Sequence, residues 1–123
     1  MTVPEARHVL LAQGTYYVAS GVSPFVSPRL FERVTGPKRD WWLVQTVGGL
    51  VTVIGCALVH AGGQDRRTPE TIGLAAGSAT VLSAIEVVHV ARGRISPVYL
   101  ADAVVQAATI GVLAVSLKRP AIR

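Results

Sequence analysis

The chain has 123 residues, of which 50% are hydrophobic and only 15% are charged, and its formal net charge is +5. A soluble domain normally has about a quarter of charged residues, so the composition argues against a soluble globular protein. The 12 basic residues are scattered over separate polar segments and are not interleaved with aromatic residues. This scatter argues against nucleic-acid binding and favours membrane lipids, with their anionic headgroups, as the partner of the basic side chains.

Four apolar segments alternate with short polar ones, and they predict an all-α fold. We expect a four-transmembrane-helix bundle that forms a single domain over residues 1–123, with helices at about 5–26, 41–61, 70–91 and 97–117. A helix of about 20 apolar residues crosses the ~30 Å hydrocarbon core of a bilayer. Four spans place both termini on the same side of the membrane. The basic residues divide evenly between the two sides, so the positive-inside rule leaves the orientation undetermined.

The first predicted helix carries a stripe of polar side chains with the i, i+3, i+4, i+7 spacing of one helix face. Its members are Gln13, Tyr16, Tyr17 and Ser20. The outer face of a membrane helix must be apolar, so we expect this stripe to point into the bundle.

Two Ser-Pro pairs follow, Ser23-Pro24 and Ser27-Pro28, and each is expected to break the helix because the residue before a proline is pushed out of the α region. The next segment, residues 29–34, has apolar residues on one side and charges on the other. It predicts a short interfacial helix between the first two spans. Trp41 then opens the second span in the manner of an interfacial aromatic belt.

The remaining spans carry small residues at helical spacing, which predict close helix contacts within the bundle or between subunits. In the second span the inward stripe is expected to be Gln45, Gly48 or Gly49, Thr52 and Cys56. The last two spans begin with a cap residue and a proline, Thr68-Pro69 and Ser96-Pro97. Their small-residue ladders are Gly73-xxx-Gly77 and Ala103-xxx-Ala107-xxx-Gly111.

Two acids, Glu86 and Asp102, lie inside predicted spans, where acids are rare and functional by default. Counted from the link between the last two spans at 1.5 Å per residue, both lie roughly 8 Å inside the same interface. Two carboxyls close together in a low-dielectric site cannot both ionise at low cost, so they are expected to share a proton. His89 adds an imidazole one turn from Glu86. These three residues are the predicted catalytic, proton-transferring groups.

Four other side chains are expected to reach the same depth and to bind a ligand there. They are Tyr17, Gln45, Tyr99 and Gln106. The leading interpretation is an integral membrane protein with an intramembrane polar pocket that binds, and by acid/base chemistry could transform, a small amphipathic or lipid-like ligand. The sequence does not decide whether the protein is an enzyme, and it identifies no cofactor.

Two other functions stay open. Membrane acids and the even charge split also suit a small proton-coupled transporter that acts as a homodimer. Alternatively, the acids form interhelical hydrogen bonds in a structural or assembly subunit of a membrane complex. Glu86 and His89 have the i, i+3 spacing of carboxylate-bridged di-metal bundles, but a single ExxH is a weak pattern, and we predict no metal site.

Three tracts resemble segments of small, uncharacterised bacterial four-helix membrane proteins. They are 14–21, 31–38 and 93–102. The architecture is also similar to DoxX-like and EXPERA-type bundles. The first resemblance implies a multi-pass protein of a bacterial inner membrane. The second implies a bundle whose acids bind or isomerise sterol-like ligands, although the motif of that group is not matched here residue by residue.

Overall fold

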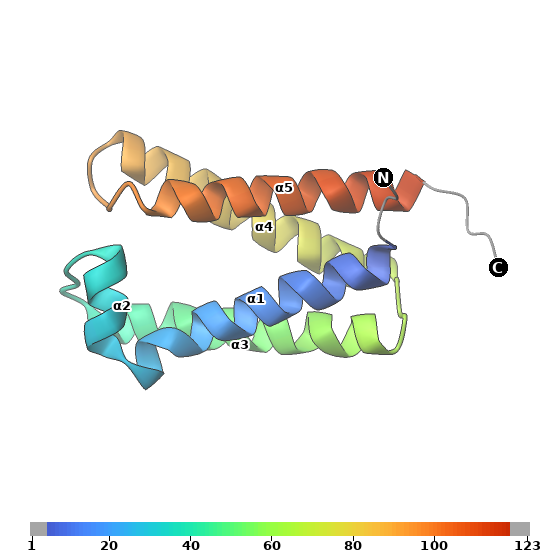
Figure 1. The fold of residues 1–123 in the computed structure, drawn as a ribbon, viewed down its shortest axis with the longest axis horizontal. Coiled ribbons are helices and arrows are strands. Elements are labelled where there is room, and N and C mark those ends of the chain that lie inside the picture. Colours follow the sequence, from blue (N-terminus) through green and yellow to red (C-terminus); the bar gives the residue numbers. More distant parts are fainter. Residues whose placement is uncertain (1–4, 119–123) are drawn as a thin grey trace.

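The computed structural model describes residues 5–118, and these residues form five α-helices and no strand. The all-α prediction is therefore confirmed for them. The helices are α1 (Ala6–Val26), α2 (Pro28–Thr35), α3 (Trp41–Gly63), α4 (Pro69–Ala91) and α5 (Tyr99–Lys118). The four long helices run antiparallel in chain order, and the short α2 lies at one end between them (Figure 1).

Three of the described helices, α3, α4 and α5, are long and apolar enough to cross a membrane. Large apolar side chains are exposed on them, which suits contact with lipid; examples are Leu50, Val53, Val81 and Val104. The chain therefore has the helices of a multi-pass membrane protein. The expected fourth span, α1, is not among the three. This helix contains the polar stripe, Arg7 and His8. That α1 also crosses the membrane stays a prediction.

Side-chain hydroxyls cap two of the helices, Ser27 at α2 and Thr68 at α4, and of these the sequence predicts Thr68 as a capping residue. The Ser27 hydroxyl accepts a hydrogen bond from the Leu30 N–H at the start of α2, at 3.3 Å. Thr68 caps α4 by accepting from the Thr71 N–H at 3.2 Å. These two hydrogen bonds satisfy N–H groups that a helix end leaves without an intrahelical partner. Before α5, residues 96–98 form a turn, so that helix begins two residues later than expected.

The expectation that Pro24 breaks the first helix is wrong. α1 continues through Pro24 and ends at Val26, before the second Ser-Pro pair. A proline inside a helix leaves the carbonyl four residues earlier without its usual N–H donor. Here that carbonyl belongs to Ser20, and it accepts a hydrogen bond from the Ser23 hydroxyl at 2.7 Å. The serine beside the proline thus replaces the missing donor.

The closest contact between helices joins α1 to α3. A Cβ added at Gly14 would lie 2.7 Å from the Gly55 carbonyl oxygen, and one added at Gly21 would lie 2.5 Å from that of Gly48. No side chain fits at these distances, so the glycines let two backbones touch. We call these four residues the glycine seam. The glycines repeat every seven residues on each helix, which keeps them on one face.

The inward stripe expected on α3 is wrong for Gln45 and Cys56, and of the alternatives Gly48 and Gly49 it is Gly48 that is buried. Gln45 and Cys56 are exposed, and nothing lies within 4 Å of a Cβ added at Gly49. The buried face of α3 is instead made of Gly48, Gly55, Leu58, Ala61 and Gly62. Successive residues of an α-helix point about 100° apart, so a stripe that is displaced by one residue along the sequence lies on a different face of the helix.

The expected ladder glycines of the last two spans make no close contact within the described chain. Nothing lies within 4 Å of a Cβ added at Gly73, Gly77 or Gly111. α4 buries Ala75 and Ala79 instead, and packs mainly on α5. The bundle therefore consists of two helix pairs, α1 with α3 and α4 with α5, which lie apart at the α2 end (Figure 1).

Candidate functional site

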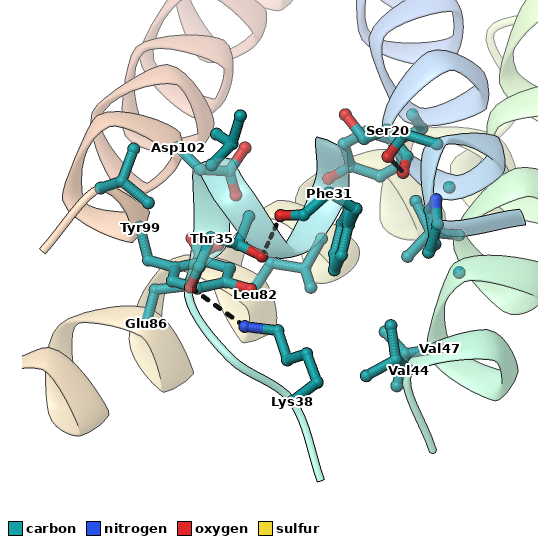
Figure 2. A pocket seen from close by; sticks show the side chains of 18 of the residues that line it. Ser20, Phe31, Thr35, Lys38, Val44, Val47, Leu82, Glu86, Tyr99 and Asp102 are labelled. Carbon is teal, nitrogen blue, oxygen red and sulfur yellow. Dashed lines mark hydrogen bonds between the residues drawn. The ribbon is translucent and has the colours of Figure 1, made fainter. Parts of the chain in front are cut away.

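A cavity of about 790 Å³ lies between the two helix pairs at the end that α2 covers. Figure 2 shows its walls: Asp102, Tyr99, Glu86 and Leu82 come from α5 and α4, and Ser20 and Val47 come from α1 and α3 on the opposite side. Phe31 and Thr35 of α2 lie between these walls. The lining of α3 and α2 is largely apolar, whereas the polar side chains gather where α1, α4 and α5 meet.

The amphipathic pattern of α2 explains how this helix borders the cavity. Its apolar side chains Leu30, Phe31 and Val34 line the cavity, whereas Arg29 and Arg33 are exposed and do not line it. The short interfacial segment expected from the sequence is thus a helix, and its apolar face is turned toward the bundle.

Lys38, just after α2, connects this helix to α5. Its ammonium donates a hydrogen bond to the Thr35 carbonyl at 3.0 Å (Figure 2). It also lies 5.8 Å from the ring centre of Phe31 and 5.2 Å from that of Tyr99, within range of cation–π attraction. Lys38 therefore holds a positive charge at the wall of the cavity that Glu86 and Asp102 also line.

A network of hydrogen bonds joins α1 to α5 at the polar end of the cavity. The Tyr17 hydroxyl donates to Gln106 Oε1 at 2.7 Å, and Gln106 Nε2 donates to Asp102 Oδ2 at 3.3 Å. The Tyr16 hydroxyl donates to the other carboxylate oxygen, Oδ1 of Asp102. Asp102 thus accepts two hydrogen bonds. This is the environment of an ionised carboxylate, which can only accept.

Glu86 completes the cluster from α4, with 8% of its surface exposed. Its carboxyl interacts with that of Asp102. Its Oε1 atom is buried and has no hydrogen-bond partner within residues 5–118. Two carboxyls can hydrogen-bond only when one carries a proton. If the two carboxyls share a proton, as the sequence predicts, the two donors that Asp102 accepts favour Glu86 as its carrier.

Most of the predicted site residues lie together. Glu86, Asp102, Tyr17, Tyr99 and Gln106 all line the same cavity. They come from α1, α4 and α5, of which α1 is distant in sequence from the other two, and their common depth follows from counting residues inward from the helix ends. Whether they bind a ligand or transfer protons stays a prediction.

The structure does not bring Gln45 and His89 to this site. Neither residue lines the cavity; Gln45 is exposed on α3, and His89 is half-buried in the last turn of α4. Gln45 is turned away because its neighbour Val44, together with Gly48, occupies the side of α3 that faces the cavity. His89 lies one turn beyond Glu86, past the cavity wall.

Sequence reasoning did not include Tyr16 and Lys38 among the site residues. Tyr16 belongs to the predicted polar stripe, and its pairing with Asp102 could have been found from spacing. Tyr16 and Tyr17 are adjacent on α1, while their partners Asp102 and Gln106 are one turn apart on α5. Lys38 lies in a connecting segment, and no sequence pattern predicts that it contacts Tyr99.

The described residues contain no group of three or more His, Cys, Asp or Glu side chains that could hold a metal ion. The ExxH pair does not form such a group with Asp102, because Glu86 lines the cavity and His89 does not. The site is therefore a cluster of carboxyl, phenol and amide groups at one end of an apolar cavity.

Comparison of the chain with protein-family models, with curated proteins and with solved structures finds no match.

Proposed function

We propose that the protein is a four-span membrane protein that binds a small amphipathic or lipid-like molecule in the cavity beneath α2. The observation that supports this most directly is the division of the cavity wall. One part is apolar, with Val47 and Phe31, and one short stretch holds Glu86 and Asp102. A volume of about 790 Å³ lies within the range of sites for small molecules.

Glu86 defines what the polar end of the ligand must offer. A buried oxygen without a hydrogen bond costs about 1–3 kcal/mol, and Glu86 Oε1 is such an atom. A hydroxyl or amide N–H on the ligand would donate to it and remove this cost. The ligand class is therefore an apolar molecule with an uncharged donor at one end, because a cation or an anion would be costly at this depth.

The apolar body of the ligand would extend from Glu86 toward α2. Leu82 and Val47 face this space from opposite walls, and Phe31 lies between them (Figure 2). Such a molecule would enter from the bilayer, since α2 has the amphipathic pattern of a helix that lies among lipid headgroups. Transfer of this uncharged ligand from the bilayer into the cavity would bury no additional charge.

Native mass spectrometry of the protein extracted in mild detergent tests the proposal. Wild type should retain a small molecule of defined mass, and Ala101→Trp, which places a bulky side chain in the cavity wall, should lose it. Glu86→Gln keeps an acceptor at this position and should weaken retention less than Ala101→Trp does. Gln45→Ala, which changes an exposed residue outside the cavity, is the matched control.

Equal retention by wild type and Ala101→Trp would show that the molecule binds elsewhere, for example as annular lipid. A wild-type protein that carries no molecule, and takes none up from added lipid extract, would contradict the proposal. A change of the retained mass on incubation would show that the site also transforms its ligand, the reaction for which the Glu86 proton is available.

A further inference from the structure

Two connections that are far apart in sequence are neighbours at the α2 end of the bundle. The first, residues 27–40, contains α2 and joins α1 to α3, and the second, residues 92–98, joins α4 to α5. A Cβ added at Gly36 of the first would lie 3.7 Å from the Cβ of Ser96 in the second. Both connections lie at the same end of the molecule (Figure 1). One belongs to each helix pair, so the two pairs approach each other here through their connections.

Both connections carry an excess of basic residues. The first holds four basic and two acidic residues, and the second holds two basic and no acidic residues. The two acids adjoin Lys38 and Arg39: the Glu32 carboxylate accepts a hydrogen bond from the Lys38 backbone N–H at 3.0 Å, and Asp40 follows Arg39 in the chain. Four exposed arginines remain, which we call the basic surface. They are Arg29 and Arg33 of α2, and Arg92 and Arg94 of the second connection.

No carboxylate of the described chain neutralises the basic surface. The ion pairs within residues 5–118 join His8 to Glu5 and Arg67 to Asp65, and both lie at the opposite end of the bundle. The connection at that end, residues 64–70, has two basic and two acidic residues, so its net charge is zero. At the α2 end, in contrast, two positively charged connections lie side by side. Like charges at short range repel, so these connections are held together more firmly when an anion binds to both.

The position of the basic surface indicates which anion this is. α3 begins at Trp41, α4 ends at Ala91 and α5 begins at Tyr99, and these three helices are long and apolar enough to cross a membrane. Both connections therefore lie just beyond the spans, at the level of the lipid headgroups. The phosphate of a phospholipid lies at this level, and an arginine binds phosphate through two parallel, charge-assisted hydrogen bonds.

We propose that the basic surface binds anionic phospholipids of the adjoining leaflet, and that their phosphates link α2 to the connection between α4 and α5. Each basic residue at an anionic membrane surface strengthens binding by roughly fivefold. A zwitterionic headgroup also has a phosphate, but its own cationic group offsets that charge, so the surface favours headgroups with a net negative charge. Attraction of both connections to the same anions replaces their mutual repulsion and holds α2 over the cavity.

This proposal requires the membrane location of the protein but no ligand in the cavity. The two proposals therefore fail separately. Loss of the retained small molecule in Ala101→Trp, with unchanged preference for anionic lipid, would concern the cavity only. Loss of the lipid preference in arginine variants, with the small molecule still retained, would concern the basic surface only.

Titration of the detergent-solubilised protein with phosphatidylglycerol and with phosphatidylcholine, followed by native mass spectrometry, tests the lipid preference. Wild type should bind phosphatidylglycerol more tightly than phosphatidylcholine. The double variant Arg33→Gln/Arg94→Gln, which removes one charge from each connection, should weaken binding of phosphatidylglycerol roughly tenfold or more and leave phosphatidylcholine binding unchanged. Equal wild-type affinity for the two lipids would overturn the proposal.

Arg66→Gln/Arg67→Gln is the matched control, because it removes the same number of charges from the neutral connection at the opposite end. Its affinity for phosphatidylglycerol should stay close to that of wild type. An equal loss in the two double variants would show that binding follows overall charge, and would contradict the assignment to the α2 end. If the first double variant does not fold, Arg29→Gln/Arg92→Gln tests the same surface with its other two members, and unchanged affinity in that variant would also overturn the proposal.

Hydrogen exchange tests the link between the two connections. In nanodiscs of phosphatidylcholine mixed with phosphatidylglycerol, the backbone amides of residues 29–35 should exchange roughly fivefold more slowly than in phosphatidylcholine alone, and Arg33→Gln/Arg94→Gln should abolish the difference. Equal exchange of wild type in both kinds of nanodisc would contradict the link. Inorganic phosphate, added to phosphatidylcholine nanodiscs, should not slow exchange. If it does so as strongly as phosphatidylglycerol, the surface binds soluble anions and the assignment to lipid is wrong.

Discussion

The two sides of α1 differ in how closely they pack against their neighbours. Toward α3, Gly14 and Gly21 bring the two backbones into contact and leave no space between them. Toward α4 and α5, the same helix offers Gln13, Tyr16 and Tyr17, and two cavities remain. The difference shows that one helix can hold the fold together and carry the chemistry when each task has its own face. The rigid seam on one side allows hollow, polar packing on the other.

The seam provides the largest test of this contrast. Gly14→Leu should destabilise the protein by about 3 kcal/mol or more, because the new side chain meets the Gly55 carbonyl and Val59, and a backbone cannot move aside as a side chain can. The measurement is reversible unfolding in mixed detergent micelles, followed by circular dichroism.

Gly77→Ala is the matched control for the seam. Nothing lies within 4 Å of a Cβ at this position on α4, so the change should be neutral or stabilise the helix by about 0.5–1 kcal/mol. Comparable losses in Gly14→Leu and Gly77→Ala would mean that the seam has no special role, and the contrast between the two sides of α1 would then be wrong.

The elements of the bundle could be predicted because each depends on local sequence. The length of the apolar segments predicts the four long helices, and Thr68-Pro69 predicts the start of α4. The polar stripe of α1 was also predictable, because side chains at helical spacing share one face whatever the neighbours are. Gln13 and Tyr17 are indeed buried, with 4% and 1% of their surfaces exposed.

The rotation of α3 could not be predicted in the same way. Its polar and small residues are distributed around the helix, so composition did not choose between the face of Gly48 and Gly55 and the face of Gln45 and Cys56. That choice is made by α1, whose own glycines fit only against the first face. The contact between Lys38 and Tyr99 is likewise set by how α2 folds back, which no single segment specifies.

Variants of Glu86 and Asp102 test the side of α1 that faces α4 and α5. Asp102→Asn should cost about 1–3 kcal/mol, because an amide has a single acceptor oxygen, so one of the two donors that Asp102 accepts, Tyr16 or Gln106, would lose its partner. Glu86→Gln should cost less, since an amide N–H can take the place of the proposed carboxyl proton toward Asp102. The same unfolding measurement applies. Equal losses in both variants would contradict the assignment of the proton to Glu86.

Infrared spectroscopy provides a second readout of that proton. Wild type at neutral pH should show the carbonyl stretch of a protonated carboxylic acid, and Glu86→Gln should lose it. This follows from the donors that Asp102 accepts and Glu86 does not. A protonated-acid band that persists in Glu86→Gln would place the proton on Asp102.

The hydrogen bond between Tyr17 and Gln106 should contribute less than the acids. Tyr17→Phe keeps the ring but leaves the buried Gln106 Oε1 without its donor, and we expect a loss of about 1–2 kcal/mol in unfolding. Tyr99→Phe is the control, because the hydroxyl of Tyr99 does not take part in the network that joins α1 to α5. A loss in Tyr99→Phe as large as that in Tyr17→Phe would contradict the assignment.

The smallest effect is expected at Lys38. Its contacts with Phe31 and Tyr99, at the α2 end of the first cavity, are the weakest of those considered. Lys38→Met keeps the length of the side chain and removes the charge that Phe31 and Tyr99 attract. The free energy of local opening of α2 should therefore fall by about 0.5–1 kcal/mol, which raises the population of the open form roughly two- to fivefold. Hydrogen exchange of the backbone amides of residues 29–35 should accelerate by that factor, and Arg39→Met, at an exposed neighbour, should leave it unchanged. Because the glycine seam lies on the other side of α1, exchange in the middle of α3 should not change in either variant. Acceleration there would mean that the two sides of α1 are coupled and do not act independently.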